Sequence, residues 1–340
     1  MSKAGEPTTR QVAAAILSYC LCSSSMLMVN KLAVVHVKSP TVVTLSQFIF
    51  AAAFVLVLNL AKVVKIDPFN WDRAKYFAIY VLSFSVGTWA NIKVLAHANI
   101  ETVIVFRSCS PLAVCLLEYI FYGRDLPSKK SCLALLFITI GALVYIFTDR
   151  EFQVKGATAY YWASLWWVVL VFQLTFGKFL VSNTGMNSMW TPVALTNSFA
   201  IVPVVVIGLC SSELSVHAYH HVLKMQPMGY VWLICSCVIG TLISFSGFWC
   251  QSMITATAYT VVGVMNKMLT VMVNTIIWDK HASPTGIAAL TVCILSGSMY
   301  RQAPLRHVGT DEVNAANLAE KVPLAEDVSG DEGVPSKSSA

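Results

Sequence analysis

Basic residues inside long apolar segments are the feature of this sequence that most clearly points to chemistry. Lys267 lies in the apolar stretch 255–277, about 12 residues from its ends. That is about 18 Å along a helix, too far for a lysine side chain to reach water. Arg107 lies some six residues into the stretch 101–122. A charge in the hydrocarbon region costs at least about 2.5 kcal/mol, so two retained cations favour a binding site for an anion.

Other charges in apolar segments have a simpler alternative reading. Lys31, Lys93 and Lys178 lie within about a turn of the ends of their segments, where a lysine can extend to the lipid headgroups. Glu118 follows Arg107 by eleven positions and shares its helical face. A counter-ion for a lysine, a proton carrier and an interface residue all remain open as its role.

Polar side chains accompany Lys267 along one helical stripe. Tyr259, Gly263, Asn266 and Lys267 are spaced i, i+4, i+7 and i+8, and Ser244 lies in the preceding apolar stretch. Hydroxyl and amide groups beside a cation suit a phosphate joined to a planar polar ring. The alternative, that small residues only let helices pack closely, explains the glycine but not the lysine.

The composition shows what must position these residues. The 340 residues are 56% hydrophobic and 12% charged, with 23 Lys and Arg against 17 Asp and Glu. Soluble domains carry roughly 25% charged residues, so a soluble globular protein is excluded. A disordered chain and a strongly basic nucleic-acid binder are excluded as well. We therefore expect a polytopic membrane protein.

Ten apolar segments are long enough to span a bilayer, separated by turn residues and charges. We expect spans at approximately 11–32, 41–64, 75–97, 101–122, 130–148, 157–180, 189–210, 228–251, 255–277 and 284–300. The third and fourth spans, and the eighth and ninth, are almost without a loop, so a single kinked helix is an alternative at either place. The polar tail 301–340 is expected to be disordered.

The distribution of basic residues predicts the orientation. Eleven Lys and Arg lie in one alternating set of loops and termini and five in the other. Positively charged loops stay on the cytosolic side, so both termini are expected in the cytosol, as an even number of spans requires.

An internal repeat is indicated at an offset of 160 positions. Gly87 and Gly247 match at this offset, as do Trp89 and Trp249, and Arg107 then corresponds to Lys267. We expect two five-helix halves, 11–148 and 149–300, flanked by tails 1–10 and 301–340. Because five is odd, the halves have inverted orientations, as in transporters that bind substrate between them.

Catalytic and metal-binding motifs were not found. The ten cysteines have no zinc-type spacing, and the cluster His217, His220 and His221 has no acidic or cysteine partner nearby in sequence. There is no Walker loop, GxSxG or HExxH motif. We expect no enzyme activity, no cofactor, no metal and no nucleic-acid partner.

Five ordered segments resemble the nucleotide-sugar transporters of the drug/metabolite transporter superfamily, in particular the plant-type GDP-mannose and GDP-fucose transporters of the GDP-sugar branch. The segments are Asn30-Lys31, Asp67-Pro68-Phe69-Asn70-Trp71-Asp72, Phe106-Arg107-Ser108, Gly263-Val264-Met265-Asn266-Lys267 and Ile277-Trp278-Asp279-Lys280-His281. The fourth is similar to the signature G-A-L-N-K of that branch. The resemblance covers about residues 10–302.

The resemblance implies ten helices in two inverted halves and a Golgi antiporter that exchanges cytosolic GDP-sugar for lumenal GMP by alternating access. Gly263, Asn266 and Lys267 would hold the nucleotide phosphates and the sugar, with Tyr259 and Ser244 lining the same pocket. Apart from the resemblance, the need to match a mobile anion with fixed positive charge makes Arg107 a candidate to join Lys267 in neutralising the diphosphate. The matching Asn30 and Lys31 complete the candidate set.

One segment departs from the family pattern. The family motif F-Y-N-N, whose asparagines bind guanine, corresponds here to Ala194-Leu195-Thr196-Asn197, so only Asn197 matches. An exchanger of organic phosphates such as triose phosphate or phosphoenolpyruvate, or of another nucleotide sugar, is the alternative. The sequence leaves the choice between GDP-mannose and GDP-fucose open, and likewise a homodimer.

Overall fold

The computed structural model describes residues 8–97, 100–148, 157–215, 220, 222–277 and 284–304. Over these ranges the chain forms ten long helices. They are α1 (Thr9–Val37), α2 (Pro40–Leu60), α3 (Trp71–His97), α4 (Ile100–Phe121), α5 (Lys129–Thr148), α6 (Ala157–Asn183), α7 (Trp190–Cys210), α9 (Pro227–Met253), α10 (Ala256–Ile277) and α11 (Pro284–Met299). Each overlaps one of the ten expected spans, which confirms an all-α polytopic membrane protein.

Length and composition alone identify five of the described helices as able to cross a membrane: α1, α2, α6 from Tyr161, α7 and α9. The helix α11 is shorter, with 16 residues. Large apolar side chains such as Leu60, Val202 and Leu21 are exposed on the helices. Exposed apolar side chains of this kind match a lipid environment, which has no hydrophobic driving force to bury them.

Turn residues set the helix boundaries where the sequence indicates them. The hydroxyl of Ser39 accepts a hydrogen bond from the backbone N–H of Val42, and Pro40 occupies the first helical position of α2. Proline fits that position because its missing N–H would be unpaired there in any residue. Lys38 ends α1 in the left-handed conformation, with φ 58°. Pro227 likewise opens α9.

The break between α9 and α10 is real, so these are two helices and not one kinked helix. Ile254 has an extended backbone, with φ −127° and ψ 168°. The hydroxyl of Thr255 accepts a hydrogen bond from the N–H of Ala258 at 3.0 Å, a helix N-cap. The corresponding break between α3 and α4, at residues 98–99, lies outside the described residues.

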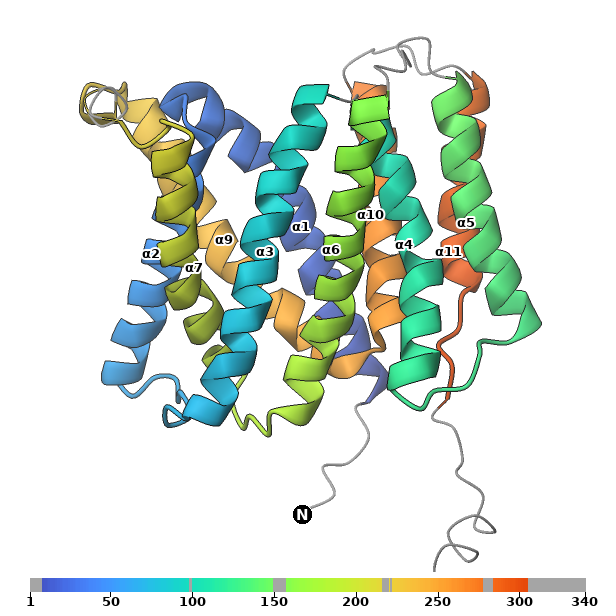
Figure 1. Cartoon of the computed structure of the whole chain (residues 1–340), viewed down its shortest axis with the longest axis horizontal. Coiled ribbons are helices and arrows are strands. Elements are labelled where there is room, and N and C mark those ends of the chain that lie inside the picture. Colours follow the sequence, from blue (N-terminus) through green and yellow to red (C-terminus); the bar gives the residue numbers. More distant parts are fainter. Residues whose placement is uncertain are drawn as a thin grey trace, which may run out of the picture. The chain divides into compact units, whose positions relative to one another are not determined.

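The pairing of helices repeats between the two halves. Extensive contacts join α1 with α9 and α3 with α6, and smaller ones join α2 with α9 and α3 with α7. The two halves correspond when α1 is matched with α6, α2 with α7, α3 with α9, α4 with α10 and α5 with α11. Under this matching the pair α1–α9 becomes the pair α6–α3, and the pair α2–α9 becomes the pair α7–α3. Three further pairs, α2 with α7, α4 with α10 and α5 with α11, match themselves, and Figure 1 shows α5 beside α11. This is the pairing of two inverted five-helix repeats.

Helix boundaries correct the expected offset of the repeat. Both ends of α9 lie 156 positions after the ends of α3, and both ends of α10 lie 156 positions after those of α4. The predicted offset of 160 is therefore wrong by about one helical turn, which returns to nearly the same helical face. Arg107 is the counterpart of Gly263, and Lys267 is the counterpart of Pro111, the proline inside α4.

Candidate functional site

The predicted stripe of α10 packs against α1. The ring of Tyr259 is buried, with its centroid 4.7 Å from that of Tyr19 in α1. A methyl group at Gly263 would come within 3.5 Å of the Tyr19 hydroxyl oxygen, so the glycine lets this hydroxyl lie close to the backbone of α10. Tyr259 and Gly263 are thus brought together with Tyr19, which the sequence did not single out.

Arg107 of α4 and Lys267 of α10 lie close enough for their positive charges to repel one another. Both are partly buried. Among the described residues, neither forms an ion pair with a carboxylate. Tyr19 also lies within electrostatic range of Arg107. Two neighbouring cations that have no acidic partner in the described part of the chain provide the environment that an anion would neutralise.

Asn266, adjacent to Lys267, is buried and only partly hydrogen-bonded. Its side-chain oxygen accepts a hydrogen bond from the hydroxyl of Ser24 in α1 at 2.9 Å. Its main-chain oxygen accepts one from the hydroxyl of Thr270 at 2.7 Å. Its side-chain nitrogen Nδ2 is buried with no hydrogen-bond partner. An amide NH2 is a donor only, so this part of the site presents a donor.

Asn197 of α7 and Ser244 of α9 are also brought together. Asn197 is 2% exposed and donates from Nδ2 to the Val193 carbonyl at 2.7 Å and to the Ser244 hydroxyl at 3.1 Å. The neighbouring Thr196 hydroxyl is buried without a partner. These groups form a second polar cluster, carried by helices other than α10.

Asn30 belongs to a hydrogen-bond network that joins α1, α2 and α9. Its side-chain oxygen accepts from Gln47 at 2.9 Å and from Ser236 at 2.8 Å, and Gln47 also donates to Ser236. The oxygen of Asn30 is therefore engaged in helix packing. The side chains of Lys31 and Lys93 lie outside the described part of the chain.

Lys178 of α6 binds the end of α9. Its ammonium donates to the carbonyl oxygens of Gln251 at 2.6 Å and Ser252 at 3.4 Å. The last carbonyls of a helix lack partners within the helix and carry partial negative charge. A lysine there stabilises the helix end, which separates Lys178 from Lys267 and Arg107 in role.

Glu118 of α4 binds the start of α10. Its carboxylate is 4% exposed and accepts hydrogen bonds from the N–H groups of Ala256 at 2.9 Å and Thr257 at 3.0 Å, and from the Thr257 hydroxyl. Its ion-pair partner is Arg124, at 3.6 Å. Lys178 lies within electrostatic range of this carboxylate but forms no ion pair with it among the described residues. A negative charge at a helix N-terminus is stabilising.

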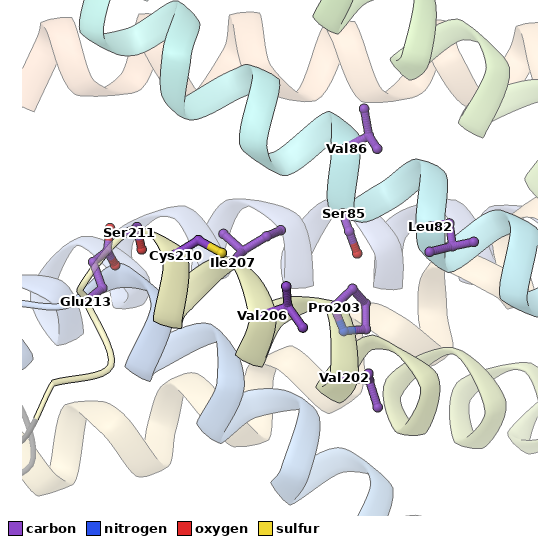
Figure 2. Close-up of a pocket in the computed structure, with 10 residues that line it drawn as sticks. All are labelled: Leu82, Ser85, Val86, Val202, Pro203, Val206, Ile207, Cys210, Ser211 and Glu213. Atoms are coloured by element: carbon purple, nitrogen blue, oxygen red, sulfur yellow. The ribbon is translucent and has the colours of Figure 1, made fainter.

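A groove of about 700 Å³ lies elsewhere, between α3 and α7 (Figure 2). Leu82, Val86, Val202 and Val206 line it and are themselves exposed. The groove contains none of the predicted site residues, and Glu213 is its only charged lining residue. An apolar groove with a carboxylate is chemically unsuited to phosphates.

Tyr19 and Ser24 are not identifiable as site residues from the sequence. Both lie in an ordinary apolar helix, Ser24 within the run Ser23-Ser24-Ser25. Serine is common in membrane helices as a packing residue, so its type carried no signal. Only the packing of α1 against α10 distinguishes Ser24 from its neighbours.

Comparison with known proteins identifies relatives along most of the chain. A family model described as the EamA-like transporter family matches residues 11–147. GDP-fucose transporter 1 of Arabidopsis thaliana is 36% identical over 292 residues, which cover 85% of this chain and 84% of that protein. The GDP-mannose transporter GONST3 of the same plant is 33% identical over 296 residues, covering 85% and 77%.

More distant likenesses extend over similar lengths. The UDP-galactose/UDP-glucose transporter 7 of Arabidopsis thaliana is 26% identical over 322 residues, covering 88% of this chain and 92% of that protein. A solved crystal structure has a TM-score of 0.61 and 13% identity, covering 86% of this chain and 96% of its own. At that identity the likeness shows the fold alone.

Proposed function

The chain belongs to the nucleotide-sugar transporters of the drug/metabolite transporter superfamily, in the plant-type GDP-sugar branch, and from this premise we propose that it is an antiporter. It carries GDP-mannose or GDP-fucose from the cytosol into the Golgi lumen and returns GMP by alternating access. A GDP-fucose transporter and a GDP-mannose transporter, each more than 30% identical to this chain, support the GDP-sugar class.

The observation that carries this proposal is the pair Arg107 and Lys267. Their charges repel and have no acidic partner among the described residues. A diphosphate that crosses the bilayer core requires matching positive charge, and these two side chains supply it. The adjacent Asn266 offers its unpartnered NH2 to the same anion.

The same pair gives a physical reason for exchange. An empty site would retain two desolvated cations, and unpaired buried charge is costly. Closure of the transporter around an empty site is therefore unfavourable. A GDP-sugar in one direction, or GMP in the other, neutralises the site and allows closure.

Selection of the base and sugar is assigned to polar groups of α7, α9 and α10. Tyr259, Gly263 and Ser244 line the pocket, and Asn197 with Ser244 contributes to recognition of guanine. Lys31 remains a candidate contact. Asn30 shapes the site indirectly, because its oxygen is engaged by Gln47 and Ser236.

Orientation and location complete the proposal. The excess of Lys and Arg in one set of loops supports cytosolic termini. In Figure 1 the start of α1 and the connections α2–α3, α6–α7 and α9–α10 lie at one end of the helices, which becomes the cytosolic end. A homodimer in the Golgi membrane is part of the proposal.

Counterflow into GMP-preloaded proteoliposomes tests the proposed function. Radiolabelled GDP-mannose, GDP-fucose, UDP-galactose, CMP-sialic acid and triose phosphate are offered separately. We expect GMP-dependent uptake of one or both GDP-sugars, abolished by Lys267→Ala and unchanged by Lys75→Ala at an exposed surface ion pair. Uptake of UDP-sugars or of triose phosphate in place of GDP-sugars would overturn the substrate class and favour the alternative exchangers.

A further inference from the structure

The side-chain hydrogen bond of Asn266, in the α10 stripe, fixes which way its amide group is turned. It is 6% exposed. Its side-chain oxygen is occupied by Ser24, while its NH2 group has no partner. Buried amides in proteins almost always find partners for their polar atoms, so an NH2 left unpaired beside Lys267 indicates an acceptor supplied from outside the chain.

Ser24 is positioned to hold this arrangement from a different helix. The helices α1 and α10 contact one another and both start at the same end of the helices. Tyr19 meets Tyr259 at one level, and Ser24 meets Asn266 further along both helices. The Ser24 hydroxyl oxygen also lies 3.2 Å from the Thr270 hydroxyl oxygen, which can donate to Ser24 in place of the Asn266 main-chain oxygen. The contact between Ser24 and Asn266 is thus part of the α1–α10 interface.

We propose that Ser24 is a positioning residue for substrate binding: its hydroxyl fixes the Asn266 amide so that the NH2 group donates to a phosphate oxygen bound by Lys267. The inference rests on the proposed function and deepens it. Ser24 itself contacts Asn266 and not the substrate. Its effect on the substrate passes through the orientation of one amide.

The orientation of the Asn266 amide matters because its oxygen accepts hydrogen bonds and its NH2 group donates them. Phosphate oxygens accept hydrogen bonds, and the ammonium of Lys267 only donates them. An amide turned by 180° would place its carbonyl oxygen against the phosphate, where two acceptors meet without a hydrogen. A serine that donates to Oδ1 favours the productive orientation and disfavours the reverse.

The test measures counterflow on the substrate that the wild-type protein takes up, with Ser24→Ala, Ser24→Thr and Ser25→Ala. Loss of one oriented hydrogen bond predicts that Ser24→Ala raises KM for the sugar nucleotide and the inhibition constant of GMP, each roughly fivefold to tenfold, with little change in maximal rate. Ser24→Thr keeps the hydroxyl and should restore both constants. Ser25→Ala changes an exposed side chain and should behave as wild type.

A double-mutant cycle with Asn266→Ala separates positioning from a general effect on helix packing. If Ser24 acts through Asn266, then Ser24→Ala should have no further effect on either constant in the Asn266→Ala background. Equal effects in both backgrounds would overturn the proposal. A raised KM with unchanged GMP inhibition would also overturn it, because the amide would then bind the sugar and not the phosphate.

The outcomes distinguish this inference from the proposed function. If the wild-type protein takes up a different phosphorylated substrate, the proposed GDP-sugar class fails, and the Ser24 effect is measured on that substrate. If the wild-type protein exchanges GDP-sugar for GMP and Ser24→Ala leaves both constants unchanged, only the role of Ser24 fails.

Discussion

At the scale of single residues, the lysines of the membrane helices fall into two kinds. The ammonium of Lys178 is bound by two carbonyl oxygens at the end of α9. Lys178 also lies near the positive charge of Arg124, but the negative charge of Glu118 acts on it as well. Lys267 lies near the positive charge of Arg107 and has no carboxylate ion-pair partner among the described residues. On the proposed function, Lys178 stabilises the fold, whereas Lys267 is retained for binding at the expense of stability.

This difference predicts opposite effects of the same substitution. Lys267→Met should raise the unfolding free energy of the substrate-free protein by roughly 1–3 kcal/mol, because it removes one of two repelling, partly buried charges. It should also abolish transport. Lys178→Met should lower stability, because the carbonyls of Gln251 and Ser252 lose their donor. Thermal unfolding in detergent with and without GMP measures both variants. A destabilised Lys267→Met protein that still gains stability from GMP would contradict this account.

At the scale of helices, the break between α9 and α10 is held by side chains from two other helices. Lys178 of α6 binds the last carbonyls of α9, and Glu118 of α4 binds the first amides of α10. The groups left unpaired by the break are those that a continuous helix would satisfy internally. Side chains from α4 and α6 thus replace the missing hydrogen bonds and fix where α10, with its stripe of site residues, begins.

Glu118 should accordingly be important for stability. Glu118→Ala leaves the N–H groups of Ala256 and Thr257 and the charge of Arg124 without their acceptor, and should lower the unfolding free energy by roughly 2–4 kcal/mol. Glu118→Gln keeps an acceptor oxygen and should lose less. Thermal unfolding of both variants in detergent measures the difference. Equal stability of Glu118→Ala and wild type would show that the helix start does not depend on this carboxylate.

At the scale of the whole molecule, the ten spans follow from the sequence because apolar length and punctuation encode them directly, as at Ser39-Pro40 and Gln226-Pro227. The hydrogen-bond partners of the polar residues cannot be predicted from the sequence in this way. Ser24 and Asn266 are separated by 242 positions, and helical periodicity shows which residues share a face but not which helix meets that face. The repeat has the same limit: a shift of one helical turn preserves the face, so the residue pattern predicts an offset of 160 where the helix bounds give 156.

Asp67 joins the connection between α2 and α3 to the connection between α6 and α7 by hydrogen bonds. Its carboxylate, in the connection between α2 and α3, accepts hydrogen bonds from the N–H groups of Asn187 at 3.0 Å and Ser188 at 3.3 Å, and from the Thr191 hydroxyl at 2.9 Å. The side-chain amide of Asn187 adds a fourth. These donors lie in the connection between α6 and α7 and at the start of α7.

These hydrogen bonds make stability depend on pH in a defined direction. Burial alone would raise the pKa of Asp67, but the hydrogen bonds from Thr191, Ser188 and Asn187 outweigh it and hold the pKa below its ordinary value of 3.8. A carboxyl whose pKa is lower in the folded state stabilises the fold above its unfolded pKa. The contribution is lost as the pH falls from about 4 through the lower pKa of the folded protein.

Asp67→Asn should therefore reduce the loss of stability that the wild-type protein shows as the pH falls below about 4. The variant should be less stable than wild type near pH 7, where the charged acceptor is absent, and the two should converge as the pH falls below 4. Thermal unfolding in detergent between pH 3 and 7 measures this, with the exposed Asp72→Asn as the control that should follow wild type. If Asp67→Asn lost stability on acidification as steeply as wild type, another carboxylate would have to account for the acid sensitivity. Asp67 would then be a solvated loop residue that does not stabilise the contact between the two connections.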